Sequence, residues 1–284
     1  MLHQDYQKIE GKRFGEERAL YESHGVWLQN CAFDGEEDGE SALKESSDVL
    51  VQDTLCNLRY PFWHDERLTV ERCEMTPLCR AALWYSSNIT VKDSRLHGIK
   101  ALRECDHVLI EDSDIVSAEF GWSVSNLQMK RSSAEGEYFM LRLRDFQLED
   151  VTFKGKYSFQ YSENGVLENC DLNTKDAFWH SKNVLLKNCT VRGEYLAWYA
   201  ENLTMVNCRI IGTQPFCYCK NLRLIDCEMI DADLAFEKSD VEATVTTPMI
   251  SIKNVASGHI TLPALGEWIQ TDPHAKGVVT LQNI

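Results

Sequence analysis

The chain has 284 residues, 44% of them hydrophobic, and a formal net charge of −15 at pH 7. This length and apolar content suffice for a large buried core, and no stretch approaches the roughly 18 apolar residues of a membrane span. The strong negative charge argues against nucleic-acid binding, which needs a dense cationic face. It also opposes polyanionic ligands, except at a local cationic pocket.

The beginning of the chain and its cysteines predict a compartment. Residues 1–10 lack the apolar segment of a signal peptide. The eleven cysteines include no Cys-x-x-Cys spacing, which argues against a zinc site. Because cysteines stay reduced where no secretory signal is present, we expect a cytoplasmic protein with no disulfide, metal, cofactor or membrane attachment.

A solenoid pattern begins after residue 24. Four apolar residues mark its first coil: Val26, Leu28, Cys31 and Phe33. An acidic loop at 35–40 follows, and Asp48 and Arg67, which lie 19 residues apart, then begin two successive coils. After a two-residue insertion, the repeat is regular from Asn88 to about residue 240. We predict one domain over 1–284, with about eleven coils over 25–240 and caps at 1–24 and 241–284.

The repeat has a period of 19 in sequence number. The residues that start successive coils are Asn88, His107, Asn126, Asp145, Asn164, Asn183, Asn202 and Asn221. Apolar residues follow one, three, six and eight places later, with polar residues between them, which is the pattern of strands joined by a turn. We therefore predict an all-β fold, a single-stranded right-handed parallel β-helix, since crossover chirality favours right-handed winding.

Stacked rows support this register. Five places after each start comes a corner rich in Asp and Asn, where Asn169, Asn188 and Asn207 can form an amide ladder. A third apolar strand is expected around 177–179 and 196–198. From Asp145 onward, the residue before each start alternates in charge, and we call this the charge row: Arg144, Glu163, Lys182, Glu201 and Lys220. Opposite charges attract when coils stack.

Two other solenoids fit the sequence less well. The stretch from Val184 to Val191 mimics a leucine-rich repeat, but the period of this chain is below the roughly 20–29 of that repeat. Its leading leucine is also replaced, for example by Ser181 and Ala200. A left-handed hexapeptide β-helix would repeat at every sixth position, and this chain does not.

Two stacked rows invite a functional interpretation but favour a structural one. The cysteine stack consists of Cys170, Cys189, Cys208 and Cys227. It resembles a metal ladder, yet free cysteine is a common small core residue. The tryptophan row consists of Trp63, Trp84, Trp122, Trp179 and Trp198, and it adjoins a row with Phe62, Phe159, Phe178 and Phe216. Stacked aromatic residues are more often core than ligand platform.

The most informative row follows the tryptophan row and should face outward. This corner row consists of Glu45, His64, Tyr85, Glu104, Ser123, Arg142, Tyr161, His180, Tyr199, Tyr218 and Glu237. Its acids and imidazoles suit acid–base chemistry, so the predicted catalytic residues are Glu45, His64, Arg103 and Glu104. The predicted substrate-binding residues are Lys44, Tyr85, Lys100, Arg142, Tyr161, Asp176, His180 and Tyr199. The alternative is an inert solvated face, which every β-helix needs.

Several segments carry a family resemblance: Gly15 to Leu20, Gly39 to Glu45, Arg80 to Tyr85, Asp176 to His180 and Gly193 to Leu196. On these residues the chain resembles a bacterial family catalogued as domain of unknown function 3737, over nearly its whole length. It is also similar to the pectin-lyase-like β-helices. The resemblance implies the fold and no activity, since the Asp-Asp, Gly-His-Gly and Arg-x-Lys motifs of polygalacturonases are absent. The acidic cluster of a calcium pectate lyase is missing as well.

Two functions stay open at this stage. The first is a carbohydrate-binding or carbohydrate-active β-helix, a hydrolase or lyase if it is an enzyme. Exposed tyrosines suit sugar rings, and paired carboxylates such as Glu45 and Glu104 suit glycoside hydrolysis. The second is a non-catalytic cytoplasmic scaffold or protein-binding solenoid. A glycan or another protein is thus the expected partner, and the sequence does not predict an oligomeric state.

Overall fold

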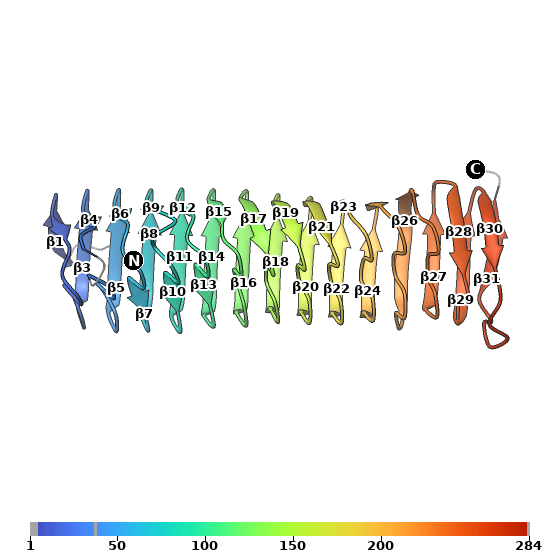
Figure 1. The fold of residues 1–284 in the computed structure, drawn as a ribbon, viewed down its shortest axis with the longest axis horizontal. Coiled ribbons are helices and arrows are strands. Elements are labelled where there is room, and N and C mark those ends of the chain that lie inside the picture. The colour runs from blue at the N-terminus through green and yellow to red at the C-terminus, as the bar shows by residue number, and fades with distance from the viewer. Residues whose placement is uncertain (1–4, 37–38, 283–284) are drawn as a thin grey trace. The chain divides into compact units, whose positions relative to one another are not determined.

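The computed structural model describes residues 5–36 and 39–282. The chain is an all-β parallel solenoid of about 14 turns of about 19 residues, and those ranges contain no helix. The predicted right-handed parallel β-helix is confirmed (Figure 1). The chain divides into two compact units, residues 1–140 and 141–284, which we describe separately as unit 1 and unit 2. The single domain expected from the sequence stays a prediction.

Unit 1 has three sides. The strands of its first side are β1 (Gln7–Glu10), β3 (His24–Gln29), β5 (Ser47–Gln52), β8 (Glu66–Glu71), β11 (Ser87–Lys92), β14 (Asp106–Glu111) and β16 (Ser125–Lys130). Those of the second side are β2 (Arg13–Phe14), β4 (Ala32–Phe33), β6 (Leu55–Cys56), β9 (Glu74–Met75), β12 (Arg95–Leu96), β15 (Asp114–Val116) and β17 (Ser133–Glu137). The third side has the short strands β7 (Phe62–Trp63), β10 (Leu83–Trp84) and β13 (Leu102–Arg103).

Unit 2 repeats the first two sides. The first side has β18 (Arg144–Glu149), β20 (Glu163–Glu168), β22 (Lys182–Lys187), β24 (Glu201–Val206), β26 (Leu222–Ile230), β27 (Asp240–Val245), β29 (Ser257–Leu262) and β31 (Val278–Leu281). The second side has β19 (Thr152–Lys156), β21 (Asp171–Lys175), β23 (Thr190–Arg192) and β25 (Arg209–Ile211). Two further strands, β28 (Met249–Lys253) and β30 (Leu265–Ile269), pair with each other.

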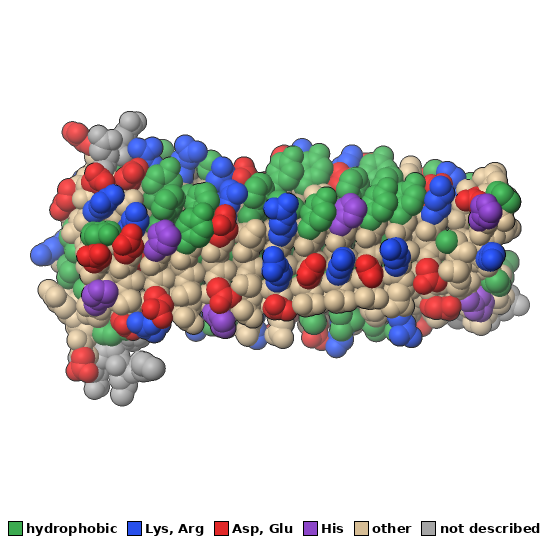
Figure 2. Space-filling model, turned by 90° about the horizontal axis from the view of Figure 1, so that it is seen from below, with side chains coloured by type: hydrophobic (Ala, Val, Ile, Leu, Met, Phe, Trp, Pro, Cys, Tyr) green, Lys and Arg blue, Asp and Glu red, His purple; other side chains and the backbone are tan. Residues whose placement is uncertain are grey.

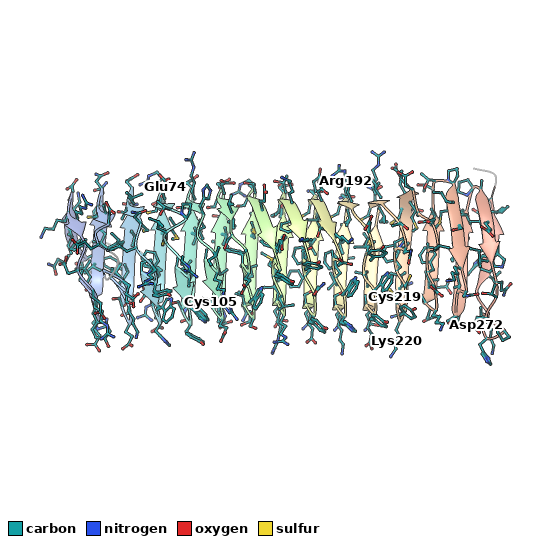
Figure 3. All side chains as sticks on the ribbon, in the orientation of Figure 1. Glu74, Cys105, Arg192, Cys219, Lys220 and Asp272 are labelled. Atoms are coloured by element: carbon teal, nitrogen blue, oxygen red, sulfur yellow. The ribbon has the colours of Figure 1, made fainter. Side chains whose placement is uncertain are left out.

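The predicted register is confirmed in both units. In unit 1, Ile89 pairs with Val108, at a sequence separation of 19. In unit 2, Val184 pairs with Leu203, again at a separation of 19. In each unit, the alternating apolar side chains are buried between the sides. Polar neighbours project outward, as Lys220 does beside the buried Cys219 (Figure 3).

The stack has more coils than the sequence predicted, because strands continue into both presumed caps. In unit 1, Gln7 on β1 pairs with Val26 on β3. In unit 2, Asp240 pairs with Ser257 and Met249 pairs with Leu265, at sequence separations of 17 and 16. The coils near the end are shorter, so a search at the constant period does not detect them.

The third side of unit 2 is not the strand that the sequence predicted. Residues 177–179 and 196–198 lie in turns, because Phe178 and Ala197 have φ of 58° and 57°, in the left-handed region. Their amides still bond between coils, since Phe178 N donates to Ser158 O at 2.9 Å and Ala197 N donates to Ala177 O at 2.8 Å. The side thus turns sharply and keeps its coil-to-coil hydrogen bonds.

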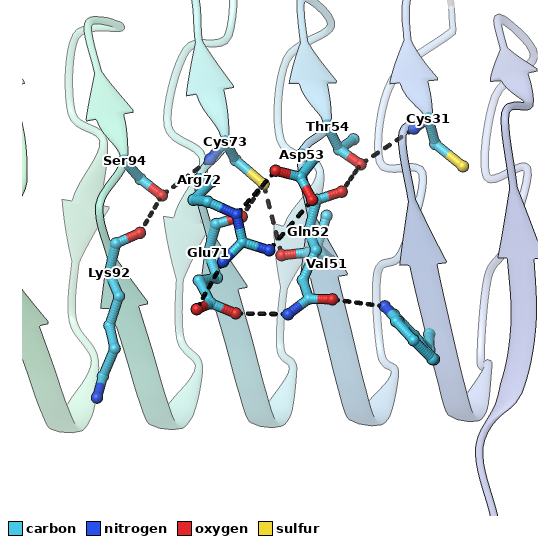
Figure 4. Close-up of polar contacts among 11 residues, drawn as sticks. Cys31, Val51, Gln52, Asp53, Thr54, Glu71, Arg72, Cys73, Lys92 and Ser94 are labelled. Atoms are coloured by element: carbon cyan, nitrogen blue, oxygen red, sulfur yellow. Dashed lines mark hydrogen bonds and ion pairs between the residues drawn. The ribbon is translucent and has the colours of Figure 1, made fainter. Parts of the chain in front are cut away.

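The cysteine stack has the structural role that the sequence predicted, and Cys73 occupies the same place in a coil of unit 1. In unit 1, Cys73 N donates to Ser94 Oγ at 3.0 Å, and Ser94 Oγ donates to Lys92 O at 2.6 Å (Figure 4). In unit 2, Cys170 N approaches Cys189 Sγ at 3.4 Å, and Cys189 Sγ donates to Lys187 O at 3.2 Å. The thiol therefore makes the bonds that a serine hydroxyl makes in the same place of other coils.

Candidate functional site

The corner row owes its outward direction to the backbone. Its residues from Glu45 to Tyr218 all have left-handed φ, for example 62° at Glu45 and 56° at His180. The row departs from the strict repeat at its end. Tyr218 N donates to Glu237 O at 2.7 Å, and Lys238, with φ 54°, takes the corner position expected for Glu237.

In unit 1, Glu45 forms its hydrogen bond with a residue of the preceding coil, Tyr21, and not with its row neighbour His64. Its carboxylate accepts a hydrogen bond from Tyr21 Oη at 2.8 Å and lies 3.6 Å from Lys44 Nζ. The Tyr21 hydroxyl, with smaller contributions from Lys44 and His64, lowers the pKa of Glu45 below its usual value. Glu45 is thus ionised at neutral pH and is unsuited to act as a general acid.

His64 and Arg103 are held by aromatic rings. The His64 imidazole stacks on Tyr85, with ring centroids 5.1 Å apart. The Arg103 guanidinium lies between the indoles of Trp84 and Trp122, 4.9 and 4.5 Å from their centroids. The exposure of the Arg103 side chain is 19%, so this contact fixes the arginine within the surface.

Acidic residues complete the surroundings of Arg103. Arg103 lies 3.6 Å from Glu104 and 3.4 Å from Glu119. Lys100 also reaches Glu119, at 3.5 Å. Glu119 is not among the residues predicted from the sequence, although Lys100 and Glu119 occupy the same place in successive coils and so stack directly.

Glu45 and Glu104 do not form a glycosidase pair. Three coil steps separate them, roughly 14 Å at the ~4.8 Å spacing of strands. Glycosidase carboxyl groups lie about 5–5.5 Å apart in retaining enzymes and roughly 6.5–9.5 Å apart in inverting ones. The catalytic function of Glu45, His64, Arg103 and Glu104 as individual residues therefore stays a prediction.

In unit 2 the corner row becomes a ladder of four stacked rings, which we call the ring ladder: Tyr161, His180, Tyr199 and Tyr218. Successive centroids are 4.9, 4.8 and 4.8 Å apart, with interplanar angles of 6°, 5° and 8°. Tyr161 and Tyr199 are 48% and 45% exposed. Figure 2 shows a line of green side chains that includes one purple histidine. Beside it runs a line of alternating blue and red side chains, the charge row.

Trp179 and Trp198 form a second aromatic column beside the ring ladder. Their indoles stack at 5.4 Å with an interplanar angle of 5°. Trp179 Nε1 donates to Tyr195 O at 2.7 Å and Trp198 Nε1 donates to Gln214 O at 2.8 Å. The phenylalanines of the neighbouring row are core residues, as predicted. The tryptophans are only half-buried and help to form the outer face, so the core interpretation is wrong for them.

Polar groups border this aromatic face. Lys175 and Glu194 form an ion pair at 2.9 Å. Asp176 is only 7% exposed. Burial raises the pKa of Asp176, Lys175 lowers it and Glu194 raises it again, with a net rise above the usual value.

Cations stand at both ends of the ring ladder. Arg142 and Lys238 occupy the corner positions before Tyr161 and after Tyr218. Both are exposed, and neither forms an ion pair within the described part of the chain. Of the predicted binding residues, unit 2 therefore brings Arg142, Tyr161, His180 and Tyr199 into one row, with Asp176 beside it.

The search for metal sites and membrane-spanning helices covers the residues that the structure describes. Among the described residues, no group of three or more His, Cys, Asp or Glu side chains is placed to hold a metal ion. No helix in residues 5–36 and 39–282 has the length and apolar character to cross a membrane.

Comparison with known proteins gives the family. The model of the family "Protein of unknown function (DUF3737)" matches residues 7–281. The chain belongs to this family. Among curated proteins, no relative of this DUF3737 chain was found.

Three solved structures are distantly similar to this DUF3737 chain. PfbA, a surface adhesin of Streptococcus pneumoniae, is 8% identical with a TM-score of 0.41, over 87% of this chain and 79% of its own. The A-module of the Azotobacter vinelandii mannuronan C-5 epimerase AlgE6 is 11% identical with a TM-score of 0.38, over 96% and 87%. The catalytic domain of a GH87 α-1,3-glucanase is 8% identical with a TM-score of 0.37, over 99% and 65%. Similarity this distant carries no argument about function.

Proposed function

We propose that this chain is a non-catalytic glycan-binding protein and that the ring ladder of unit 2 is its binding face. The observation that carries the proposal is the stack of Tyr161, His180, Tyr199 and Tyr218, whose rings are parallel within 8°. Tyr161 and Tyr199 are exposed, and His180 and Tyr218 are half-buried. Aromatic rings present a large apolar surface with polar tips. A sugar ring has the matching character, an apolar face rimmed by hydroxyl groups.

The ladder is also preorganised. Each inner ring contacts a ring in the coil before it and one in the coil after it, and Trp198 braces Tyr218 at 5.8 Å in an edge-on contact. A side chain already fixed in its bound rotamer loses little entropy on binding. The lowered pKa of Glu45 and the wide spacing of Glu45 and Glu104 favour binding without hydrolysis.

Tyrosine substitutions in the ladder test the proposal. We expect Tyr161→Ala and Tyr199→Ala each to weaken binding of an oligosaccharide selected on a glycan array at least tenfold, about 1.4 kcal/mol. Tyr161→Phe and Tyr199→Phe keep the ring and should bind within about threefold of the wild type. Isothermal titration calorimetry gives the affinities, and circular dichroism verifies the fold.

Tyr85→Ala is the matched control. Tyr85 is 48% exposed like Tyr161 and also stacks on a histidine, but it lies in unit 1. Its removal should leave binding unchanged. If Tyr85→Ala weakens binding as much as Tyr161→Ala does, the ring ladder is not the binding face. If no glycan on the array binds, the alternative of a protein-binding solenoid replaces this proposal.

A further inference from the structure

The structure changes the charge at one end of the ring ladder. By sequence spacing, Glu237 follows Tyr218 in the corner row and would end the row of unit 2 with a carboxylate. In the structure, Tyr218 N donates to Glu237 O at 2.7 Å, and Lys238 takes the corner position with φ 54°. The Glu237 carboxylate lies 3.1 Å from Lys253 Nζ and is already paired. A lysine therefore stands where the spacing predicted an acid.

An arginine stands at the other end of the ladder. Arg142 N donates to Gln160 O at 2.9 Å, and the residue after Gln160 is Tyr161, the first ring of the ladder. Within residues 142–238, all of which the structure describes, the corner row thus consists of a cation, four rings and a cation, without an acid. In unit 1 the same row includes glutamates. The two parts of the row therefore differ in the charge of the ligand that suits them.

Both end cations are available to an anion. Arg142 and Lys238 are exposed, and neither has an ion pair within residues 5–36 and 39–282. Asp240, two places after Lys238, accepts a hydrogen bond from Ser257 Oγ at 2.7 Å. The charge row beside the ladder adds three cations and two acids, so the ladder and the charge row together carry more cations than acids.

This local excess matters because the chain as a whole has a net charge of −15. Long-range repulsion opposes an acidic ligand. At physiological ionic strength, however, exposed charges more than about 8 Å apart are largely screened from each other. The charges that an acidic ligand meets on this face are therefore mainly those of the ladder ends and the charge row.

We propose that the ligand of the ring ladder is an acidic oligosaccharide, whose uronic acid carboxylates pair with Arg142 and Lys238. Five coil steps separate the two cations, roughly 24 Å at the ~4.8 Å spacing of strands, so an extended chain with several acidic units reaches both. A guanidinium group binds a carboxylate through two parallel hydrogen bonds, and the sugar units between the ends lie along the four rings. This inference rests on the glycan-binding function proposed above.

A glycan array that pairs uronic acid oligosaccharides with their carboxyl-reduced forms tests the ligand class. Reduction turns each carboxylate into an uncharged hydroxymethyl group and keeps the sugar chain. We expect the wild type to bind an acidic oligosaccharide at least tenfold more tightly than its reduced form, as measured by isothermal titration calorimetry. If both forms bind equally while Tyr199→Ala still weakens binding, the ligand class is wrong and the ring ladder stands.

Glutamine variants at the two ends test the contacts. Arg142→Gln and Lys238→Gln should each weaken binding of the acidic probe at least fivefold and leave binding of the reduced probe within twofold of the wild type. Arg80→Gln is the matched control, because Arg80 is an exposed arginine of unit 1 without an ion pair among the described residues. It changes the net charge equally and should bind the acidic probe within twofold of the wild type.

Two further outcomes would contradict the inference. If Arg80→Gln weakens binding as much as Arg142→Gln does, the overall charge decides and the two end contacts are wrong. If no glycan binds, or if Tyr161→Ala and Tyr199→Ala bind the acidic probe like the wild type, the proposed function fails and this inference fails with it. Circular dichroism verifies that the glutamine variants fold, as we expect for substitutions at exposed positions.

Discussion

Asp65 shows how one coil position changes the chemistry of a residue. It is 2% exposed, and its Oδ1 accepts a bond from Ser46 N at 3.0 Å, while Oδ2 has no partner among the described residues. At the same place in the next coil, Ser86 donates to Phe62 O at 2.8 Å. A protonated Asp65 can accept and donate like that serine. Burial raises its pKa from 3.8 to about 8, so the acid is neutral at pH 7.

The stability of the fold should therefore depend on pH through Asp65. The unfolded chain releases this proton near pH 4 and the folded chain only near pH 8. The contribution of Asp65 to the stability of the folded state is therefore fully present below about pH 4. It is lost as the pH rises to about 8. We expect Asp65→Asn, whose amide can donate, to raise the melting temperature by several degrees at pH 8 and to flatten its pH dependence between 4 and 8. Differential scanning calorimetry measures both, and an unchanged pH profile would show that Asp65 is already ionised in the fold.

At the scale of elements, the charge row shows how parallel strands select their neighbours. Glu163, Lys182 and Glu201 lie opposite one another on β20, β22 and β24. Opposite charges in such stacked positions stabilise by roughly 0.2–1 kcal/mol, and like charges destabilise. The row also strengthens the register, because a slip of one coil would place like charges together.

Reversing one charge in this row tests the coupling. Lys182→Glu puts three carboxylates in consecutive coils, and we expect a lower melting temperature at low salt. Since salt screens exposed charges, most of the loss should disappear at 1 M NaCl, where the Debye length is about 3 Å. Lys182→Gln is the control, and it should lower the melting temperature less than Lys182→Glu does. A loss that persists unchanged in high salt would contradict an electrostatic cause.

At the scale of the whole molecule, the buried cores of both units hold the cysteines. All eleven are free and buried. Burial raises the pKa of Cys105 and Cys219 to about 12. At Cys170, by contrast, the hydrogen bond with the neighbouring Cys189 thiol lowers the pKa. A thiolate is the reactive form of cysteine, so the fold protects these thiols by both inaccessibility and protonation.

Thiol titration measures this protection. In the native protein at pH 7.5, we expect fewer than one of the eleven cysteines to react with a soluble disulfide reagent within minutes, and all eleven after denaturation. The slow native reaction should begin at Cys170, which peptide mapping identifies. Rapid native labelling of several cysteines would mean that the coils open far more readily than the burial of these thiols allows.

The sequence predicted the repeat accurately where coil length is constant. Equal spacing from Asn88 to Asn221 determines which residues stack, and it therefore predicted the register and the amide ladder. That ladder is confirmed by bonds from Asn188 to Asn169 at 3.4 Å and from Asn207 to Asn188 at 2.8 Å. Spacing failed where coils shorten, as between Asp240 and Ser257. It also did not predict the left-handed Phe178, because a bulky residue rarely adopts that conformation.

The sequence by itself thus determined the fold, the stacking order and the side chains of the corner row from Glu45 to Tyr218, because these follow from spacing along a chain that winds regularly. Only the tertiary structure decided which neighbours in that row interact. Glu45 bonds to Tyr21 rather than to His64. Asp65 and Asp176 are buried, unlike the exposed aspartates of the chain. The reason is that side-chain contacts and burial depend on rotamers and on residues of adjacent coils, which coil spacing alone does not define.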